Sequence, residues 1–328
     1  MKLIIARIAA SGMLLLGAFY FQFATAQAYP SKPIRIINPF AAGGLLDGTL
    51  RAVAQQMTES VGQPVLVENR PGASTFIGMS ACAQAAPDGY TVCATTPDSL
   101  TYNPLLFTKV PYDAENDFAP VTNLAFTNNL IVAHASAPFN NFNEMVAYAK
   151  ANPGKVNWGS WGVGSIPHIY LEWFKRNLGI EMAHIPYKGA GQAFPAILAG
   201  EIHATYGGLG FALPHIKSGK LKPLAVTPNP TALLPNVPVL AQLGGDPGLP
   251  SYFGVFAPGK TPPALVERLS AEIAKALRTP KMQEFLKNQT LEPVGNSPAE
   301  FAAFVKADRA NAQKVFKAMG IRPTDAPN

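Results

Sequence analysis

The amino-acid sequence predicts an α/β protein with two lobes, in which each lobe is a β-sheet flanked by helices and two hinge strands join the lobes. Short apolar runs alternate with segments of helical periodicity along most of the chain, as in sheets covered by helices. A strand, a glycine turn and a helix follow one another twice, around Gly43 and around Gly162. The chain has 328 residues, which is more than one hydrophobic core usually serves.

The first 26 residues have the features of a cleavable signal peptide. Lys2 and Arg7 precede an apolar stretch over residues 8–23, and Ala24-Thr25-Ala26 provides the small residues of a cleavage site. We therefore expect an exported protein whose mature chain begins near Gln27. No later stretch approaches the roughly 20 apolar residues of a membrane span.

Charge and cysteine content narrow the function classes. Charged residues make up 14% of the chain and hydrophobic ones 48%, which is typical of a well-filled globular protein rather than a disordered one. The charges are dispersed without a basic run, so we expect no nucleic-acid surface. Cys82 and Cys93 are expected to be two buried thiols, with a disulfide as the alternative, and they do not form a metal site.

The first part of the chain is predicted to form three strands with two helices between them. We expect strands at 34–38, 64–68 and 90–94, and helices that begin at Asp47 and Thr75. This alternation implies parallel strands with right-handed crossovers. Ligands of such sheets bind beyond the carboxyl ends of the strands, so the Gly43-Gly44 turn and the turn over 95–99 can face one ligand.

The same pattern restarts in the middle of the chain. Two apolar stretches, near 121–126 and 130–133, come first; we then expect strands near 155–159, 182–185, 202–206 and 221–227, and helices over 141–151, 166–178 and 190–199. A strand near 252–257 and helices over 262–278, 281–288 and 298–319 complete the chain. We assign residues 27–125 and 228–328 to the first lobe and 126–227 to the second, with the ligand in the cleft between them.

The glycine turns predict anion binding. Glycine lets the backbone approach a ligand closely, and the first N–H groups of a helix carry partial positive charge. Gly43 and Gly44 can therefore present N–H groups to a carboxylate or phosphate, and Ser160, Gly164 and Ser165 can do so from the second lobe. The alternative is that these turns only reverse the chain.

No enzyme motif accompanies the turns. The five histidines, at positions 134, 168, 184, 203 and 215, have no metal-ligand spacing, and Gly-x-Ser-x-Gly is absent. Gly162-x-Gly164 lacks the third glycine of a dinucleotide turn. Ser160 or Ser165 with His168 could pair a nucleophile with a base but lacks a third member. We therefore expect no catalysis, no cofactor and no metal.

Several short segments carry a family resemblance that covers nearly the whole mature chain. They are Pro39-Phe40-Ala41-Ala42-Gly43-Gly44 with Asp47, Glu68-Asn69-Arg70-Pro71-Gly72-Ala73, Pro87-Asp88-Gly89-Tyr90-Thr91, His184-Ile185-Pro186-Tyr187-Lys188-Gly189 and Leu224-Ala225-Val226-Thr227. Together they resemble the periplasmic receptors of tripartite tricarboxylate transporters, the Bug family. The resemblance implies a two-lobed periplasmic binding protein of the Venus flytrap type that takes small carboxylates and delivers them to a membrane permease. A sensor kinase is the alternative partner, and we expect a monomer.

The ligand-facing loops of that family match four stretches of this sequence. The expected ligand-binding residues are Phe40, Ala42, Gly43, Gly44, Leu45, Leu46 and Asp47 in the first loop, Thr95, Thr96 and Ser99 in the second, Ser160, Trp161, Gly164, Ser165 and His168 in the third, and Tyr206, Gly207 and Gly208 in the fourth. We expect Asp47 to cap its helix rather than touch an anion, because two negative charges repel. His168 can donate to a carboxylate or play a structural role.

Departures from the family pattern indicate the kind of ligand. Ala42 and Leu45 stand where members often have a proline and a hydroxyl residue, Trp161 stands where a small residue is common, and Gly207-Gly208 where an acidic residue often precedes asparagine. Each change removes polarity or adds apolar contact. This favours an aromatic dicarboxylate such as terephthalate or phthalate, stacked on Trp161 and covered by Leu45. The alternatives are citrate, succinate, glutamate or nicotinate, with Trp161 packed between helices and Leu45 turned to the core.

Overall fold

A computed structural model describes residues 29–325 of the chain. The predicted signal peptide, residues 1–26, lies outside the described residues. The chain divides into an N-terminal unit up to Lys32 and a second unit, Pro33–Asn328, which contains the helices and strands discussed below. None of the helices within residues 29–325 is long and apolar enough to cross a membrane.

Strands and helices follow the predicted order with small shifts at their ends. The strands are β1 (Ile34–Asn38), β2 (Val65–Asn69), β3 (Thr91–Thr95), β4 (Phe118–Thr127), β5 (Asn129–His134), β6 (Asn157–Ser160), β7 (Ala183–Pro186), β8 (Ala204–Gly208), β9 (Leu221–Thr227), β10 (Tyr252–Pro258) and β11 (Leu291–Pro293). The α-helices are α2 (Leu45–Val61), α3 (Phe76–Ala83), α4 (Asn103–Leu106), α5 (Phe142–Ala151), α6 (Ile166–Leu178), α7 (Ala190–Leu198), α8 (Leu209–Lys217), α9 (Pro263–Leu277), α10 (Pro280–Asn288) and α11 (Pro298–Ala318).

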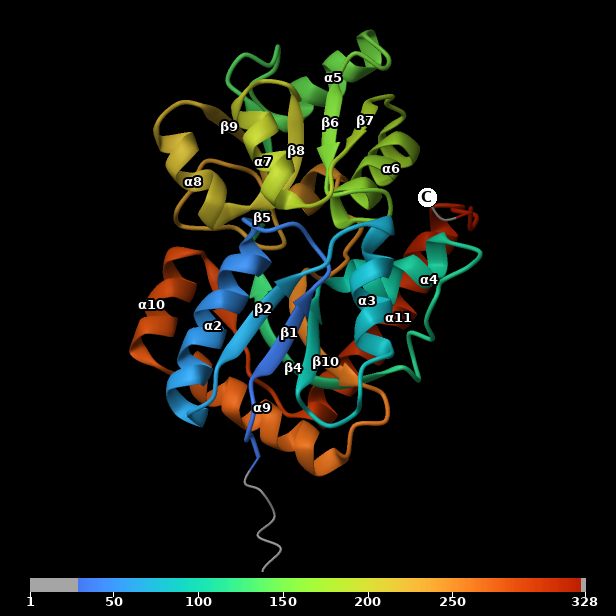
Figure 1. The fold of residues 1–328 in the computed structure, drawn as a ribbon. Coiled ribbons are helices and arrows are strands. Elements are labelled where there is room, and N and C mark those ends of the chain that lie inside the picture. The colour runs from blue at the N-terminus through green and yellow to red at the C-terminus, as the bar shows by residue number, and fades with distance from the viewer. Residues whose placement is uncertain (1–28, 326–328) are drawn as a thin grey trace, which may run out of the picture. The chain divides into compact units, whose positions relative to one another are not determined.

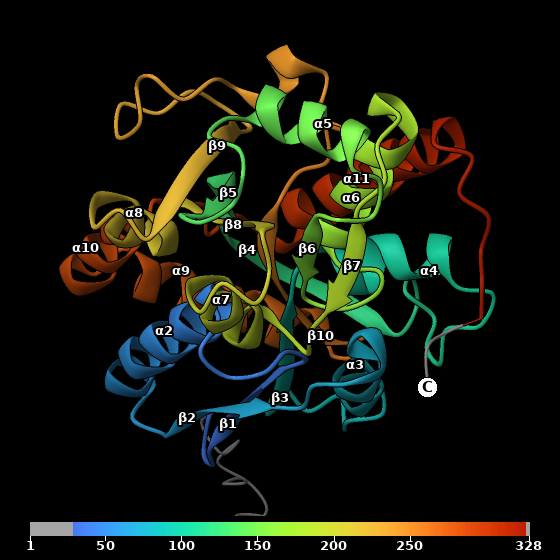
Figure 2. The same ribbon diagram turned by 90° about the horizontal axis from the view of Figure 1, so that it is seen from above.

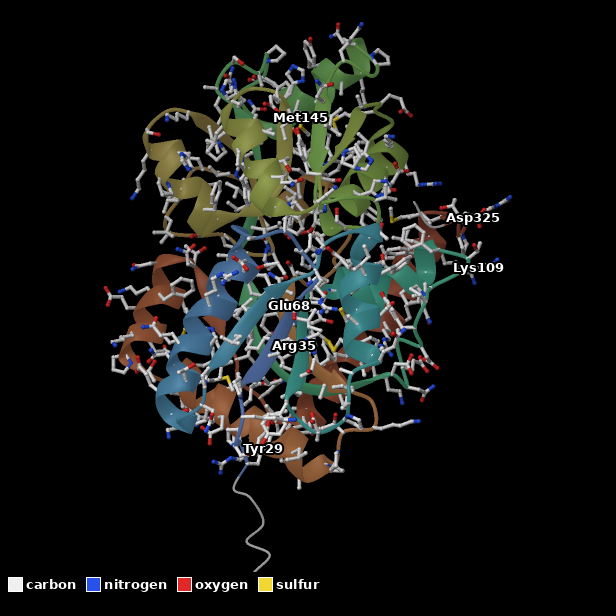
Figure 3. The ribbon with its side chains drawn as sticks, in the orientation of Figure 1. Tyr29, Arg35, Glu68, Lys109, Met145 and Asp325 are labelled. Carbon is white, nitrogen blue, oxygen red and sulfur yellow. A yellow bond between two sulfur atoms is a disulfide. The ribbon has the colours of Figure 1, made fainter. Side chains whose placement is uncertain are left out.

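Six strands form the first sheet, in the order β11-β4-β10-β3-β1-β2. Strand β1 lies between β2 and β3 and runs parallel to both, as the alternation of strands and helices predicted. Strand β10 runs antiparallel to β3 and β4, so the sheet is mixed. Helices α2 and α10 lie on one side of this sheet and α3 and α11 on the other (Figure 1). Arg35 on β1 and Glu68 on β2, both labelled in Figure 3, form an ion pair of 3.3 Å between the strands.

Five strands form the second sheet, in the order β7-β6-β8-β5-β9. Strand β6 runs parallel to β7 and β8, whereas β5 runs antiparallel to β8 and β9. Seen from above, α7 and α8 lie on one side of this sheet and α5 and α6 on the other (Figure 2). Each sheet is therefore flanked by helices on both faces, which confirms the predicted two-lobed α/β class.

The chain passes between the two sheets twice. Strand β4 ends at Thr127 in the first sheet, and β5 begins at Asn129 in the second. The chain returns between β9, which ends at Thr227, and β10, which begins at Tyr252. The segment over 221–227, predicted to bring the chain back, belongs to the second sheet through its pairing with β5. The predicted lobe boundaries at residues 126 and 227 themselves stay a prediction.

Local sequence accounts for the position of β1 and α2. Ile36 and Ile37 in β1 are buried, since both faces of a parallel strand are covered by helices. Helix α2 buries Leu50, Val53 and Met57, which recur at helical spacing and form the apolar stripe that packs on the sheet. Strand β1 therefore delivers the chain at its carboxyl end to the start of α2.

The cysteines correct the expectation of two free thiols. Cys82 on α3 and Cys93 on β3 form a disulfide, with their Cα atoms 5.9 Å apart. Helix α3 packs directly against β3, which brings the two side chains together in the interior of the first lobe. Sequence alone did not fix the register between helix and strand, so the distance could not be predicted.

Several short elements were missed. Helix α8 contains Pro214, which breaks the helical pattern in the sequence. The stretch over 95–99 was predicted to be a polar turn, but a π-helical turn begins at Asp98 and runs into α4. Strand β11 has three residues, lies at the edge of the first sheet and pairs with β4. A proline, a change of helix type and a very short length each remove the periodicity on which prediction depends.

Candidate functional site

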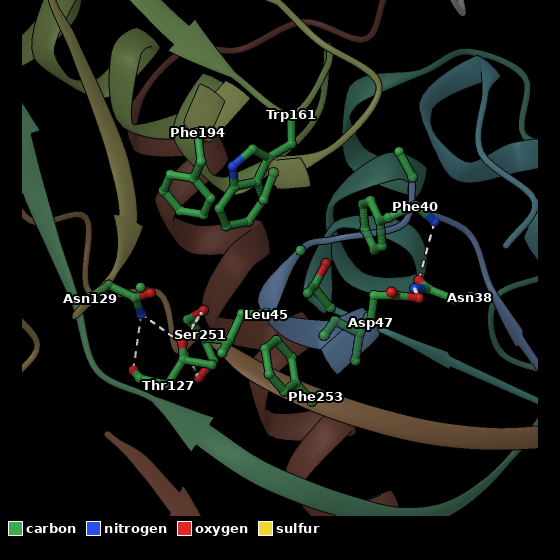
Figure 4. A pocket seen from close by; sticks show the side chains of 16 residues that line it. Asn38, Phe40, Leu45, Asp47, Thr127, Asn129, Trp161, Phe194, Ser251 and Phe253 are labelled. Atoms are coloured by element: carbon green, nitrogen blue, oxygen red, sulfur yellow. Dashed lines mark hydrogen bonds between the residues drawn. The ribbon is translucent and has the colours of Figure 1, made fainter. Parts of the chain in front are cut away.

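A cavity of about 40 Å³ lies at the carboxyl end of β1, where residues of both sheets meet. Its apolar lining consists of Phe40, Leu45, Leu46, Trp161, Phe194 and Phe253 (Figure 4). Its polar lining includes Asn38, Asp47, Thr96, Thr127, Asn129 and Ser251. Asn129 and Ser251 both hydrogen-bond to the Thr127 hydroxyl, at 2.6 and 2.7 Å, so this polar edge is held together by its own side chains.

Asp47 holds the first glycine turn in shape. Its carboxylate accepts hydrogen bonds from the Gly43 N–H at 3.1 Å, from Asn69 at 2.8 Å and from Arg51 at 3.0 Å. Burial raises the pKa of Asp47, but the hydrogen bonds from Arg51, Asn69 and Gly43 outweigh it and leave that pKa below its usual value. The helix was predicted to begin at Asp47, but it begins at Leu45. Asp47 therefore lies in its first turn.

The first turn of α2 has backbone N–H groups that no side chain caps. Gly44 is the N-cap, and no side chain caps the helix there. The helix cannot pair its own first N–H groups, which carry partial positive charge. Gly44, Leu45 and Leu46 all line the cavity. An anion in the cavity would therefore meet the positive end of α2.

The second glycine turn, between β6 and α6, satisfies its own polar groups. The Ser160 hydroxyl lies 2.6 Å from His184 Nε2 and accepts from the Gly162 N–H at 3.1 Å. The Ser165 hydroxyl donates to the Gly162 carbonyl at 2.7 Å. The Gly164 N–H donates to His168 Nδ1 at 3.2 Å. The donors that were predicted to hold a ligand from this lobe are thus engaged within the turn.

The two histidines of this region are neutral. His168 and His184 stack with their ring centroids 4.5 Å apart. Burial lowers the pKa of each to about 4, because a charged imidazole would lose its hydration. His168 uses Nδ1 as an acceptor, which requires the neutral form at that nitrogen. His168 therefore supports the turn and supplies no positive charge.

Asp98 caps α6 from the other lobe. Its Oδ1 accepts a hydrogen bond of 3.0 Å from the N–H of Ile166, the first residue of α6. Ser165, the N-cap, makes no capping bond with its own side chain. Burial raises the pKa of Asp98 to about 7. The nearby Thr96 hydroxyl lowers that pKa, but it is not placed to form a hydrogen bond with the Asp98 carboxyl group. Asp98 was not among the predicted residues, although it lies within the predicted loop over 95–99.

The lobes touch directly around the cavity. The Ala41 N–H donates to the Lys188 carbonyl at 3.3 Å. A Cβ atom on Gly191 would lie 2.1 Å from the Ala42 carbonyl oxygen, so only glycine permits this approach of α7 to the first turn. Contact of this kind, through backbone on both sides, leaves no room for a side chain at that point.

Glycines on β8 make room for the apolar wall. A Cβ atom on Gly207 would lie 2.6 Å from the Phe194 ring, and one on Gly208 would lie 2.9 Å from Leu45 Cδ2. Trp161 packs edge-on against Tyr206, with ring centroids 6.1 Å apart. The Trp161 Nε1 is buried and has no hydrogen-bond partner among the described residues. Figure 4 shows Trp161 and Phe194 next to each other and facing Leu45.

The predicted residues are only partly brought together. Those that line the cavity are Phe40, Gly44, Leu45, Leu46, Asp47, Thr96, Trp161 and Gly208. Gly164 and Ser165 line a neighbouring cavity. The remaining predicted residues line neither cavity: Ala42, Gly43, Thr95, Ser99, Ser160, His168, Tyr206 and Gly207. Several support those that do; the Thr95 and Ser99 hydroxyls, for example, bond to each other at 2.5 Å.

The lining also includes residues that sequence reasoning missed. Asn38 is the last residue of β1, Thr127 and Asn129 flank the first crossing between the sheets, and Ser251 and Phe253 flank the second. Phe194 comes from the middle of α7, and helical spacing indicates only that it is buried. The predicted lobe boundary at residues 125 and 126 was a usable signal for Thr127 and Asn129, whereas Ser251 lies far from the predicted boundary at 227. No group of His, Cys, Asp and Glu within residues 29–325 is placed to hold a metal ion.

Comparisons with known proteins identify the family of this chain. Residues 49–321 match the family model described as tripartite tricarboxylate transporter family receptor. The protein BugT of Bordetella pertussis is 33% identical over 284 residues, which cover 86% of this chain and 87% of that protein. The solved periplasmic binding protein BugD is 30% identical, with a TM-score of 0.84, over 90% of this chain and 100% of that one.

A second similar structure was solved with a ligand. Rpa4515 of R. palustris, solved with adipate, is 32% identical, with a TM-score of 0.84, and the match covers 90% of this chain and 100% of that one. The match to the family model spans most of the chain, and BugT is aligned over most of its length. The chain therefore belongs to the receptor family of tripartite tricarboxylate transporters, the Bug family of periplasmic solute-binding proteins, and it is a solute-binding receptor rather than an enzyme.

Proposed function

We propose that this receptor captures a small carboxylate with a flat, apolar body, with an aromatic dicarboxylate such as terephthalate or a phthalate isomer as the first candidate. One observation carries the proposal. A cavity with aromatic and aliphatic walls opens directly onto the uncapped N-terminus of α2. Apolar walls suit a ring, and the helix N-terminus suits a carboxylate attached to it.

The walls favour a ring over a flexible chain. Phe40, Trp161 and Phe194 contribute aromatic faces and edges to one small cavity. Aromatic pairs add roughly 0.5–1.5 kcal/mol beyond the burial of area. Gly207 and Gly208 preserve this wall, because any side chain there would displace Phe194 or Leu45. An acidic residue at either position would both fill the space and repel a carboxylate.

The carboxylate end has two sources of donors. The first-turn N–H groups of α2 point out of the helix, and the Trp161 Nε1 is buried without a partner among the described residues. Leaving a buried donor unpaired costs roughly 1–3 kcal/mol, so a ligand oxygen that accepts from it would gain affinity. Trp161 would then contact the ligand through both its ring and its N–H.

An aliphatic dicarboxylate is the second candidate. Rpa4515, which is 32% identical, was solved with adipate, whose methylene chain also suits an apolar wall. Citrate, succinate, glutamate and nicotinate fit the cavity chemistry less well, because they are more polar or smaller. The permease of a tripartite transporter is the proposed recipient, after export by the cleavable signal peptide over residues 1–26. A sensor kinase is the alternative recipient.

A thermal-shift screen of the mature protein, stripped of co-purified ligand, tests this proposal. The compounds are terephthalate, phthalate, benzoate, adipate, citrate, succinate, glutamate and nicotinate. A ligand at 100 times its dissociation constant adds about 2.7 kcal/mol to the free energy of unfolding, which raises the melting temperature measurably. We expect a shift with an aromatic dicarboxylate and none with citrate. A shift with adipate or succinate alone would overturn the aromatic proposal and leave the receptor class intact.

A further inference from the structure

A second, more polar cavity of about 250 Å³ adjoins the first. It lies between Ser74 and Thr75, the side chains of Asp98 and Asn103, and the glycine turn of the second lobe. Phe40 and Trp161 line both cavities. A flat ligand that packs on these two rings would therefore have one end near α2 and the other in the second cavity.

Two residues that line this cavity each have a buried oxygen without a hydrogen-bond partner among the described residues. Asp98 and Asn103 are 2% and 1% exposed, and within the described part of the chain neither Asp98 Oδ2 nor Asn103 Oδ1 finds a donor. The orientation of the Asn103 amide is fixed. Its nitrogen donates to the Ser74 carbonyl at 2.7 Å and to the Thr75 hydroxyl at 3.2 Å, and a carbonyl can only accept. The amide oxygen is therefore the atom left without a partner.

The backbone around these acceptors is strained. Ala73, Ser74 and Thr75 have φ values of 44°, 51° and 77°, a region that residues other than glycine rarely adopt. The Ser74 hydroxyl donates to the Val163 carbonyl of the second lobe at 2.8 Å. Strain of this kind, about 1–3 kcal/mol per residue, persists only where surrounding contacts enforce it, and it concentrates at functional sites.

The N-terminus of α6 is already occupied by a carboxylate of the chain itself. Asp98 Oδ1 accepts from the Ile166 N–H, while the Ser165 hydroxyl is turned to the Gly162 carbonyl. At pH 8, above the pKa of about 7 that burial gives Asp98, a ligand carboxylate in the second cavity would face two acceptors, the ionised Asp98 Oδ2 and Asn103 Oδ1, which repel it. Among the described residues that line this cavity, Lys188 supplies the positive charge, but its side chain is exposed and its effect is screened by solvent.

We propose that Asp98 is a specificity-determining residue: it selects ligands that present a hydrogen-bond donor, such as an amide, a hydroxyl or a protonated carboxyl group, at the end remote from α2. The inference rests on the proposed function in that the other end of the ligand is a carboxylate. The inference narrows the proposed function from a dicarboxylate to a carboxylate with a donor at its other end: with Asp98 ionised, a fully ionised dicarboxylate is a poorer ligand than the same molecule with one carboxylate replaced by a carboxamide. A site that offers buried acceptors discriminates strongly against a group that cannot donate to them.

Terephthalate and its monoamide, 4-carbamoylbenzoate, form a matched pair that tests this proposal, since they differ only in the group that would face Asp98. Calorimetric titration of the mature protein at pH 8 should give a dissociation constant about tenfold or more lower for the monoamide. Asp98→Asn keeps an oxygen for the Ile166 N–H and places a donor in the cavity. We expect this variant to lose or invert the preference.

Asp308→Asn is the matched control. Asp308 is also a buried carboxyl group, but it bonds to Thr101 at 3.0 Å and Tyr252 at 3.2 Å, away from both cavities. The ratio of the two dissociation constants should be the same in this variant as in the parent. An equal ratio in the parent and in Asp98→Asn would overturn the proposal. So would a parent that prefers terephthalate, a result that needs no variant to fold.

The same design separates failure of this inference from failure of the proposed function. If neither aromatic compound binds but adipate or its monoamide does, the aromatic assignment is wrong. The preference for the monoamide is then measured on the aliphatic pair, with the same expected inversion in Asp98→Asn. Binding of none of the four compounds would overturn both proposals.

Discussion

The two glycine turns that face each other across the cavity join a strand to a helix in the same way, but different groups accept hydrogen bonds from their backbone N–H groups. Each follows a parallel strand and opens a helix, β1 into α2 and β6 into α6. At the first turn, Asp47 bonds to the backbone from behind and leaves the helix N-terminus open to the cavity. At the second, His168 takes the Gly164 N–H and Asp98 takes the Ile166 N–H.

This difference shows that a strand, glycine turn and helix create a site for negative charge without deciding what fills it. In the first turn the acidic side chain lies on the helix itself and stabilises the loop. In the second turn it comes from the opposite lobe and occupies the position that a ligand carboxylate would take. The second turn therefore contributes to binding mainly through Trp161, which lines both cavities. The predictions below change one side of this comparison at a time.

The largest expected effect comes from separating the first turn from the second lobe. In Gly191→Ala, the new Cβ would lie 2.1 Å from the Ala42 carbonyl oxygen. Because this clash is with backbone, we expect a cost at the upper end of the usual range for overpacking, about 3 kcal/mol, so ligand affinity measured by calorimetry should fall about 150-fold. Gly48→Ala is the control, because a Cβ there meets nothing closer than 3.9 Å. Equal affinity in Gly191→Ala and the parent would mean that ligand binding does not need this contact.

Truncation of Trp161, the main contact of the second turn with the ligand, should have the next largest effect on ligand affinity. Trp161→Ala deletes a ring that lines both cavities, and the loss of its buried area should cost about 1.5–3 kcal/mol of binding free energy. Trp161→Phe keeps a ring but removes the unpaired Nε1–H, so it should retain part of that affinity. Titration of both variants separates ring contact from hydrogen bonding. A Trp161→Ala protein that binds as tightly as the parent would rule out stacking.

A smaller effect is expected where the first turn meets β8. A Cβ in Gly208→Ala would lie 2.9 Å from Leu45 Cδ2 and should weaken binding by about 1 kcal/mol. Because the clash is with Leu45, the double variant Leu45→Ala with Gly208→Ala should bind better than the sum of the single changes predicts. The coupling energy is measured by a double-mutant cycle. Strict additivity would show that Leu45 does not pack on Gly208 when the ligand is bound.

The last prediction concerns the pH dependence of stability at the second turn rather than ligand affinity. Burial raises the pKa of Asp98 from 3.8 to about 7. The folded protein therefore holds a proton that the unfolded chain releases, and Asp98 makes stability fall as the pH rises from about 4 to 7. Tyr102, at the end of the same π-helical turn, and Tyr206, on β8, both interact with Asp98, and burial raises their pKa values as well, so both stay neutral in this range.

Asp98→Asn lacks this titration. Relative to the parent, its free energy of unfolding should be higher at pH 8 than at pH 4.5 by about 3 kcal/mol, as measured by urea denaturation. Asp308 titrates in both proteins, since burial raises its pKa to about 6, and its contribution cancels in the difference. A difference between variant and parent that does not change with pH would show that Asp98 is not held in the protonated form.

The parts of the fold that depend on local pattern could be predicted. Leu50, Val53 and Met57 repeat at helical spacing, which was enough to place α2 after β1 and hence the first turn at the edge of the sheet. Pro214 inside α8 broke that periodicity, and the helix was missed. The Cys82–Cys93 disulfide depends on the register between α3 and β3, which no local pattern encodes.

The candidate site was predictable only in its loops. The pattern of glycines and hydroxyls located the turns, and the departures at Leu45 and Trp161 indicated the apolar wall. Asp98 was missed because its partner, Ile166, lies 68 residues away and in the other lobe. Whether a turn donates to a ligand or to its own chain depends on such long-range contacts.

The position of the ligand carboxylate in a crystal structure tests the central claim most directly. The complex would be prepared with the compound that gives the largest thermal shift. We predict that the carboxylate lies on the N–H groups of Gly44, Leu45 and Leu46 at the start of α2, with Asp98 still bonded to the Ile166 N–H. A carboxylate bound to the Ile166 N–H, with Asp98 displaced, would contradict the assignment of the two turns.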